Sequence, residues 1–148
     1  MDVNTTVEHF LELYGDGESG NTPTRDQWKR VISREPNASF VLVNFFKLRA
    51  EAKYQESSNQ SFASGEDAFA RYAAVSVPAM TEAGGEFVSV APFAGSFLGE
   101  DEDWDLIAIG KYPNLESFLS LYRNPKYIEA FEHRIAAVLK QAVLVMES

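Results

Sequence analysis

The chain has 148 residues, 45% of them hydrophobic, which favours one globular domain with a sizeable core. Its net charge of −9 opposes binding to nucleic acid and to anionic membrane surfaces. It contains no cysteine, which excludes disulfides, thiolate catalysis and cysteine-bound metals, and which fits a reducing compartment.

The N-terminal region predicts a helical arm. The first ten residues lack the basic and apolar segments of a signal peptide, and no apolar run approaches the roughly 20 residues of a membrane helix, so we expect a cytoplasmic protein. Hydrophobic spacing predicts helices over residues 4–14 and 25–34. Thr24 and Gln27 have the spacing of a capping box at the start of the second helix. We take residues 1–38 as this arm.

The sequence pattern of residues 39–148 predicts a separate α+β domain. The order of its elements is strand, helix, strand, strand, helix, strand, with the second helix in two pieces, as in the ferredoxin-like βαββαβ fold. Pro78 predicts a kink or a restart within the first of these helices. The expected strands are 39–48, 86–98, 104–112 and 142–147, and the expected helices are 66–83, 113–124 and 126–140.

The first strand of this domain predicts an assembly. Both alternating sides of residues 39–48 are largely apolar, which is typical of a strand that is covered on both faces. A ferredoxin-like sheet carries helices on one face only, so an apolar second face needs a partner. We therefore expect a homodimer in which two copies pack their sheets together about a two-fold axis.

Several short motifs occur along residues 40–147. They are Asn44 in the first strand, Ser64-Gly65 before the first helix, Gly84-Gly85 after it, Trp104-Asp105, Tyr112-Pro113, Pro125 with Tyr127, and His133-Arg134. Through these motifs the chain resembles the domain of unknown function 1330 family. The resemblance implies a dimeric α/β barrel of ferredoxin-like domains and leaves the reaction open.

The segment "YIEAFEHRIAA" contains the first candidate site residues. On a helical wheel, His133 points away from the apolar stripe, into solvent or under the N-terminal arm. Arg134 and Tyr127 share one flank, with the small Ala130 between them. Arg134 is either a snorkelling surface residue or a clamp for a carboxylate to which Tyr127 also donates a hydrogen bond. His133 is either exposed or a group that moves a proton.

Three further residues are candidates, each with a structural alternative. Asn44 interrupts an apolar strand, so its amide is either bonded to neighbouring backbone or directed at a ligand. Asp105 either caps the acidic turn before it or acts as a base or a partner of Arg134. Tyr72 lies on a helix face of small residues, where it fills the core or borders a pocket.

These residues predict two alternative functions. The first is a cofactor-independent enzyme acting on a small anionic organic molecule. It would use Arg134, Asn44, Tyr127 and Tyr72 for binding and His133 or Asp105 for catalysis. An isomerase or monooxygenase reaction is what the resemblance to the dimeric barrel superfamily implies. The second is a non-catalytic binding or dimerisation module. We expect no metal, because single Glu-His pairs supply too few ligands, and no organic cofactor.

Overall fold

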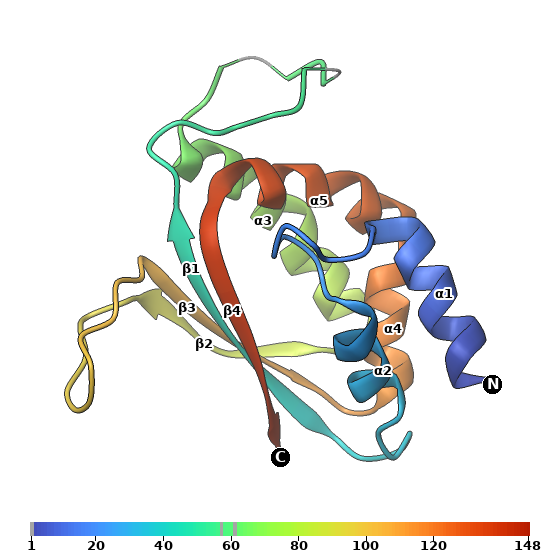
Figure 1. The fold of residues 1–148 in the computed structure, drawn as a ribbon. Coiled ribbons are helices and arrows are strands. Elements are labelled where there is room, and N and C mark those ends of the chain that lie inside the picture. The colour runs from blue at the N-terminus through green and yellow to red at the C-terminus, as the bar shows by residue number, and fades with distance from the viewer. Residues whose placement is uncertain (1, 57, 61) are drawn as a thin grey trace.

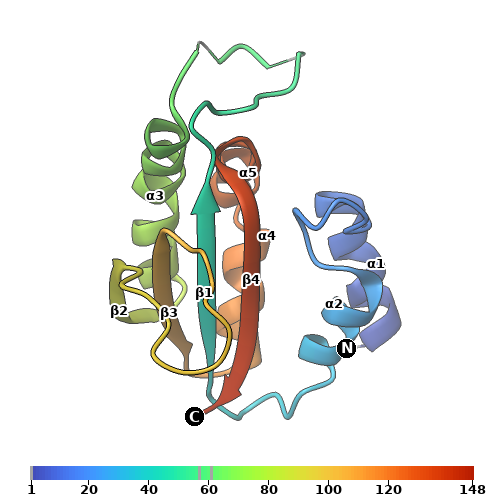
Figure 2. The ribbon, with the colours of Figure 1, turned by 60° about the vertical axis from the view of Figure 1, so that its left-hand side comes forward.

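The computed structural model describes residues 2–56, 58–60 and 62–148. Four strands form one antiparallel sheet in the order β2-β3-β1-β4, and helices α3, α4 and α5 cover one of its faces (Figures 1 and 2). This is the ferredoxin-like α+β fold that the sequence predicts. The strands are β1 (Phe40–Leu48), β2 (Glu86–Pro92), β3 (Leu106–Tyr112) and β4 (Val138–Glu147), and the helices are α1 (Val3–Tyr14), α2 (Arg25–Ile32), α3 (Gly65–Glu82), α4 (Leu115–Arg123) and α5 (Pro125–Ala137).

The N-terminal arm lies beside β4 and packs onto the helical layer (Figure 2). The predicted capping box of α2 is present, because Thr24 accepts from the backbone of Gln27 and the Gln27 side chain accepts from the backbone of Thr24. Phe10 of α1 stacks on Trp28 of α2 with ring centroids 4.6 Å apart. Both aromatic side chains belong to the main hydrophobic core, so the arm shares a core with the domain.

Several predicted elements differ from the structure. The strand predicted over 86–98 ends at Pro92. Helix α3 runs through Pro78 as one continuous helix, so a restart there is wrong. The last helix was predicted to reach residue 140, but α5 ends at Ala137 and β4 starts at Val138 with no loop between them. The carbonyls of the last two helical residues accept hydrogen bonds from Arg49 and Lys53, on the segment that follows β1. These distant donors end the helix early.

The sheet has one face covered by helices and one open face. Phe40, Leu42 and Phe46 of β1 point into the helical core, so the alternate residues of β1 point to the other side. Pairing with β3 and β4 places apolar side chains opposite them there. We call this surface the open sheet face; its apolar members include Val43, Phe45, Ile107, Ile109, Leu144 and Met146.

Among the described residues, no helix is both long enough and apolar enough to cross a bilayer. The same residues contain no group of three or more potential metal-binding side chains.

Candidate functional site

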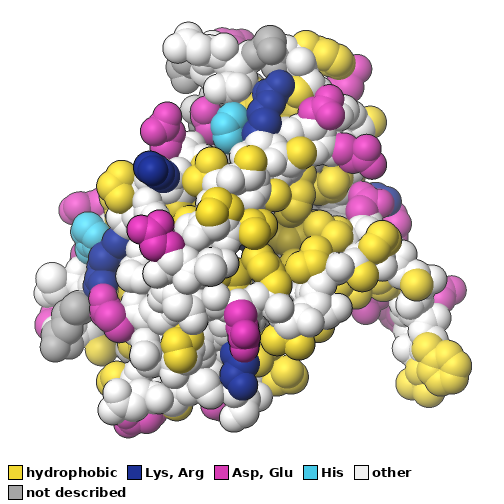
Figure 3. All heavy atoms as spheres, turned by 180° about the vertical axis from the view of Figure 1, so that it is seen from behind, with side chains coloured by type: hydrophobic (Ala, Val, Ile, Leu, Met, Phe, Trp, Pro, Cys, Tyr) yellow, Lys and Arg dark blue, Asp and Glu magenta, His cyan; other side chains and the backbone are white. Residues whose placement is uncertain are grey.

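A cavity of about 330 Å³ lies between the sheet and α3, and we call it the inner cavity. Its floor comes from Asn44 and Phe46 of β1 and from Ala108 of β3, and α3 contributes Tyr72 and Ala73 to its wall. Seen from behind, the molecule has a hollow lined by hydrophobic side chains on the side of α3 and β2 (Figure 3). Its volume and mainly apolar lining are typical of a site for a small organic molecule.

Arg134 is the charged group of this cavity. It lies in the last turn of α5 and only 6% of its surface is exposed, so it does not snorkel into solvent. Its Nη1 donates to the Tyr72 hydroxyl over 3.1 Å, and its Nε and Nη2 donate to Gln141 Oε1 over 3.1 and 2.8 Å. Its guanidinium carbon lies 4.9 Å from the Phe46 ring centroid and 5.3 Å from that of Phe131.

The partners of Arg134 are all neutral. In the part of the chain that the structure describes, no carboxylate lies within ion-pair distance of its guanidinium. None of the described residues that line the inner cavity is acidic, although the chain has 22 acidic and 13 basic residues. An arginine remains protonated inside a protein, so this cavity contains an uncompensated positive charge.

Two tyrosines extend the polar group around Arg134. The hydroxyls of Tyr72 and Tyr127 lie 2.6 Å apart, and both side chains are buried. Burial is the main cause that raises the pKa of Tyr127 well above its usual value, and the neighbouring Tyr122 and Tyr72 raise it further. The Tyr127 phenol is therefore neutral at physiological pH and can donate or accept a hydrogen bond, but it is not a general base.

Asn44 is bonded to neighbouring backbone and also lines the inner cavity. Its Nδ2 donates to the backbone oxygen of Ala108 over 3.0 Å, which satisfies the amide group against the neighbouring strand. The same side chain lines the inner cavity. The four residues predicted to bind a ligand thus come from three different elements and line the same cavity. They are Asn44, Tyr72, Tyr127 and Arg134.

His133 and Asp105, the two predicted catalytic residues, lie outside this cavity. His133 Nδ1 lies 2.7 Å from the Tyr54 hydroxyl, so it contacts the segment after β1 and not the N-terminal arm. Asp105 accepts from the backbone of Leu48 over 2.8 Å. Its ion-pair partner is Lys47 at 3.4 Å, so the structure does not show the alternative in which Asp105 pairs with Arg134.

His133 should make stability depend on pH. Burial is the main cause that lowers its pKa below the usual 6.5; Glu132 opposes this effect and Arg71 adds to it. Because the folded protein prefers the neutral imidazole, the stabilisation is complete above that value and is lost as the pH falls through the lower folded pKa. We expect His133→Gln to flatten the loss of unfolding free energy between about pH 7 and 5, measured by urea unfolding. His9→Gln is the control, and an equal flattening in both variants would contradict this assignment.

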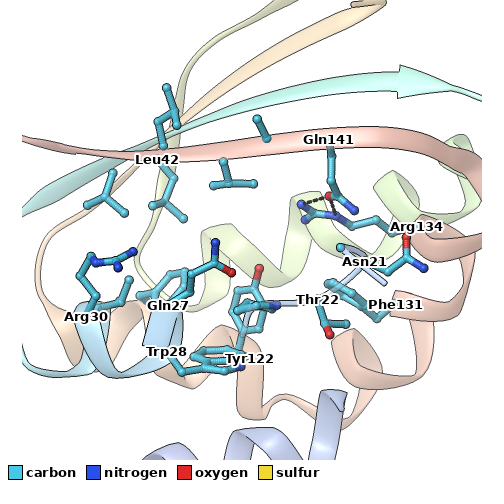
Figure 4. A pocket seen from close by; sticks show the side chains of 18 residues that line it. Asn21, Thr22, Gln27, Trp28, Arg30, Leu42, Tyr122, Phe131, Arg134 and Gln141 are labelled. Atoms are coloured by element: carbon cyan, nitrogen blue, oxygen red, sulfur yellow. Dashed lines mark hydrogen bonds between the residues drawn. The ribbon is translucent and has the colours of Figure 1, made fainter. Parts of the chain in front are cut away.

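A second cavity of about 450 Å³ lies between the N-terminal arm and β4, and we call it the arm cavity (Figure 4). Leu42, Tyr122 and Arg134 line both cavities and so form the wall between them. Sequence reasoning missed Tyr122 and Gln141 as site residues. Tyr122 fits a plain core pattern, and Gln141 falls between the predicted end of the last helix and the predicted start of the last strand.

The comparisons with known proteins agree with this fold. A model of the family described as "Domain of unknown function (DUF1330)" matches residues 62–148, more than half of the chain. The RPA0582 protein of Rhodopseudomonas palustris, described as a protein of unknown function, is 28% identical, and the match covers 86% of this chain and 95% of that one with a TM-score of 0.77. The structure of methylated RPA0582 gives the same identity, with 86% and 93% coverage and a TM-score of 0.78. A comparison with curated proteins gave no match.

Proposed function

This chain belongs to the DUF1330 family, and we propose that it binds a small, mainly apolar organic anion in the inner cavity, with Arg134 as the counter-ion. The observation that carries the proposal is the burial of Arg134 with neutral partners alone. Burying an unpaired charge costs several kcal/mol, so proteins usually pair a buried cation. A carboxylate ligand would supply the missing charge.

The free donors of Arg134 suit a carboxylate. A guanidinium has five N–H groups, and hydrogen bonds to Tyr72 and Gln141 use one each on Nε, Nη1 and Nη2. The terminal nitrogens carry further N–H groups beside the neutral Tyr122, and a carboxylate ligand would accept from them. The hydrophobic walls, including Phe69 and Met80, favour an aromatic or aliphatic body for the ligand.

Ligand charge and cavity volume provide the test. We expect benzoate and phenylpyruvate to bind the wild-type protein at least tenfold more tightly than their neutral amides, measured by calorimetry. Ala73→Leu fills the inner cavity and should abolish this binding. The matched control is Ala74→Leu, the same change on the exposed side of α3, which should leave it intact. Equal binding of acids by both variants would contradict the proposed site.

A catalytic form of this proposal is a cofactor-independent isomerase- or monooxygenase-like reaction. It is supported by Arg134 and Tyr72, which are joined by a hydrogen bond and would stabilise the oxygen of an enolate, while a water molecule accepts the proton that leaves the neighbouring carbon. We expect the protein to accelerate proton–deuterium exchange at the carbon beside the keto group of phenylpyruvate, followed by NMR. Tyr72→Phe should slow this exchange at least tenfold. Absence of any acceleration by the wild-type protein would leave binding alone as the function.

We also infer that two copies of the chain assemble through the open sheet face. Leu144 and Met146 of β4 are 58% and 52% exposed there in the single chain. Contiguous apolar surface of this kind marks an interaction site. Two-fold symmetry lets one self-complementary face cover its own copy, which makes a second chain the simplest partner.

A further inference from the structure

The arm cavity contains polar groups that the single chain does not satisfy. Gln141 accepts from both Nε and Nη2 of Arg134 through its Oε1, which fixes the orientation of its amide. The Nε2 of the same amide is buried and has no hydrogen-bond partner among the described residues. A buried donor without a partner costs about 1–3 kcal/mol. A ligand oxygen in the arm cavity would satisfy this donor.

The two ends of the arm cavity are both positively charged. Arg30 and Arg134 lie at opposite ends of the cavity, with apolar and aromatic side chains between them (Figure 4). Among the described residues, no carboxylate forms an ion pair with Arg30, and none of those that line the cavity is acidic. In a chain of net charge −9, such a cavity selects for anions.

Aromatic rings form a large part of the wall. Trp28 is 2% exposed, and it meets Tyr122 edge to face with ring centroids 5.5 Å apart. Phe118 and Phe131 line the same space. Aromatic walls favour a ligand with a flat ring, because ring pairs add about 0.5–1.5 kcal/mol beyond the area that they bury.

We propose that the arm cavity is a second binding site, for an aromatic carboxylate that carries a hydrogen-bond-accepting group at its other end. Arg30 binds the carboxylate, and Gln141 Nε2 donates to the distal oxygen. The site is built from the arm and β4, with α2 as one wall, so it is separate from the inner cavity except for the shared wall of Leu42, Tyr122 and Arg134. It does not depend on the proposed function of the inner cavity.

Trp28 provides the measurement. The chain has two tryptophans, and Trp104 packs against Phe45 and Lys140, away from both cavities. A Trp104→Phe background therefore leaves Trp28 as the only indole. We expect 4-hydroxyphenylacetate to change its fluorescence in a saturable way. Phenylacetate, which lacks the distal oxygen, and 4-hydroxyphenylacetamide, which lacks the charge, should each bind about tenfold more weakly.

Cavity-filling variants locate the ligand. Two substitutions, Val31→Phe and Val143→Phe, fill only the arm cavity. At least one of these variants should fold and bind 4-hydroxyphenylacetate tenfold or more weakly than the wild-type protein. Arg30→Gln should weaken it severalfold, and Ala73→Leu, which fills only the inner cavity, should leave it unchanged. Two results would overturn the proposal: no saturable change of Trp28 fluorescence, or a change that survives both valine variants and disappears in Ala73→Leu. Failure of benzoate to bind the inner cavity would leave this result unaffected.

Discussion

Replacing Arg134 by methionine should abolish anion binding at the inner cavity while leaving the protein folded. Hydrogen bonds to a charged group contribute about 1.5–3 kcal/mol each, so loss of the two that face a carboxylate should weaken benzoate binding by a hundredfold or more. Methionine has a similar length and packs well against aromatic rings, here those of Phe46, Tyr72 and Phe131. Calorimetry of the variant with benzoate measures the effect.

The stability of the same variant tests whether Arg134 serves the ligand or the fold. Removing a buried cation that lacks a counter-ion removes a desolvation penalty, which offsets the lost hydrogen bonds to Tyr72 and Gln141. We expect the free energy of unfolding of Arg134→Met to lie within about 1 kcal/mol of the wild-type value, from urea titration. Arg134→Ala leaves a cavity and should lose about 2–5 kcal/mol. A loss of that size in Arg134→Met would indicate a structural role for the guanidinium and contradict the ligand site.

Placing a charge on the open sheet face should dissociate the proposed dimer. Leu144 lies opposite Val43 of β1 on the edge strand β4, and it also borders the arm cavity. By two-fold symmetry, Leu144→Asp buries one unpaired carboxylate from each subunit. Since an unpaired buried charge costs several kcal/mol, the dissociation constant should rise at least a hundredfold, measured by sedimentation equilibrium.

The control for this experiment is Val77→Asp. Val77 is 45% exposed on α3, in the helical layer and away from the open sheet face. The change adds the same negative charge in place of a branched apolar side chain. It therefore tests whether any added negative charge weakens association, wherever it is placed. The proposed interface is contradicted if Leu144→Asp and the wild-type protein sediment alike, or if Val77→Asp dissociates the protein equally.

The sequence predicted the order of the elements because most of them carry a local signal. The capping box of Thr24 and Gln27 and the two apolar sides of β1 depend on neighbouring residues alone. The junction of α5 and β4 carries no such signal, since "VLKQ" after Ala137 has no glycine or proline and fits either structure. Its position depends on hydrogen bonds from Arg49 and Lys53, about 90 residues earlier in the chain, which no local pattern reveals.

The candidate site was predictable in part for the same reason. Arg134 and Tyr127 lie on one helix, so their shared flank could be derived from helical spacing. The contacts of Arg134 with Tyr72 of α3 and Gln141 of β4 need the tertiary fold. His133 and Asp105 were selected by residue type, and their partners, Tyr54 and Leu48, are also distant in sequence. Neither lines the inner cavity or the arm cavity, and their catalytic roles stay predictions.

The direct passage from α5 into β4 restricts how the length of this chain can vary. Side chains alternate between the two faces of a strand, so one residue inserted after Ala137 would turn every later side chain of β4 over. Val143 and Val145 would turn from the helix-covered face to the open sheet face, and Leu144 and Met146 would turn the other way. The proposed ligand wall and the proposed subunit contact therefore depend on the same alternation of side chains along β4. Relatives that keep both should tolerate substitution at this joint but not insertion or deletion.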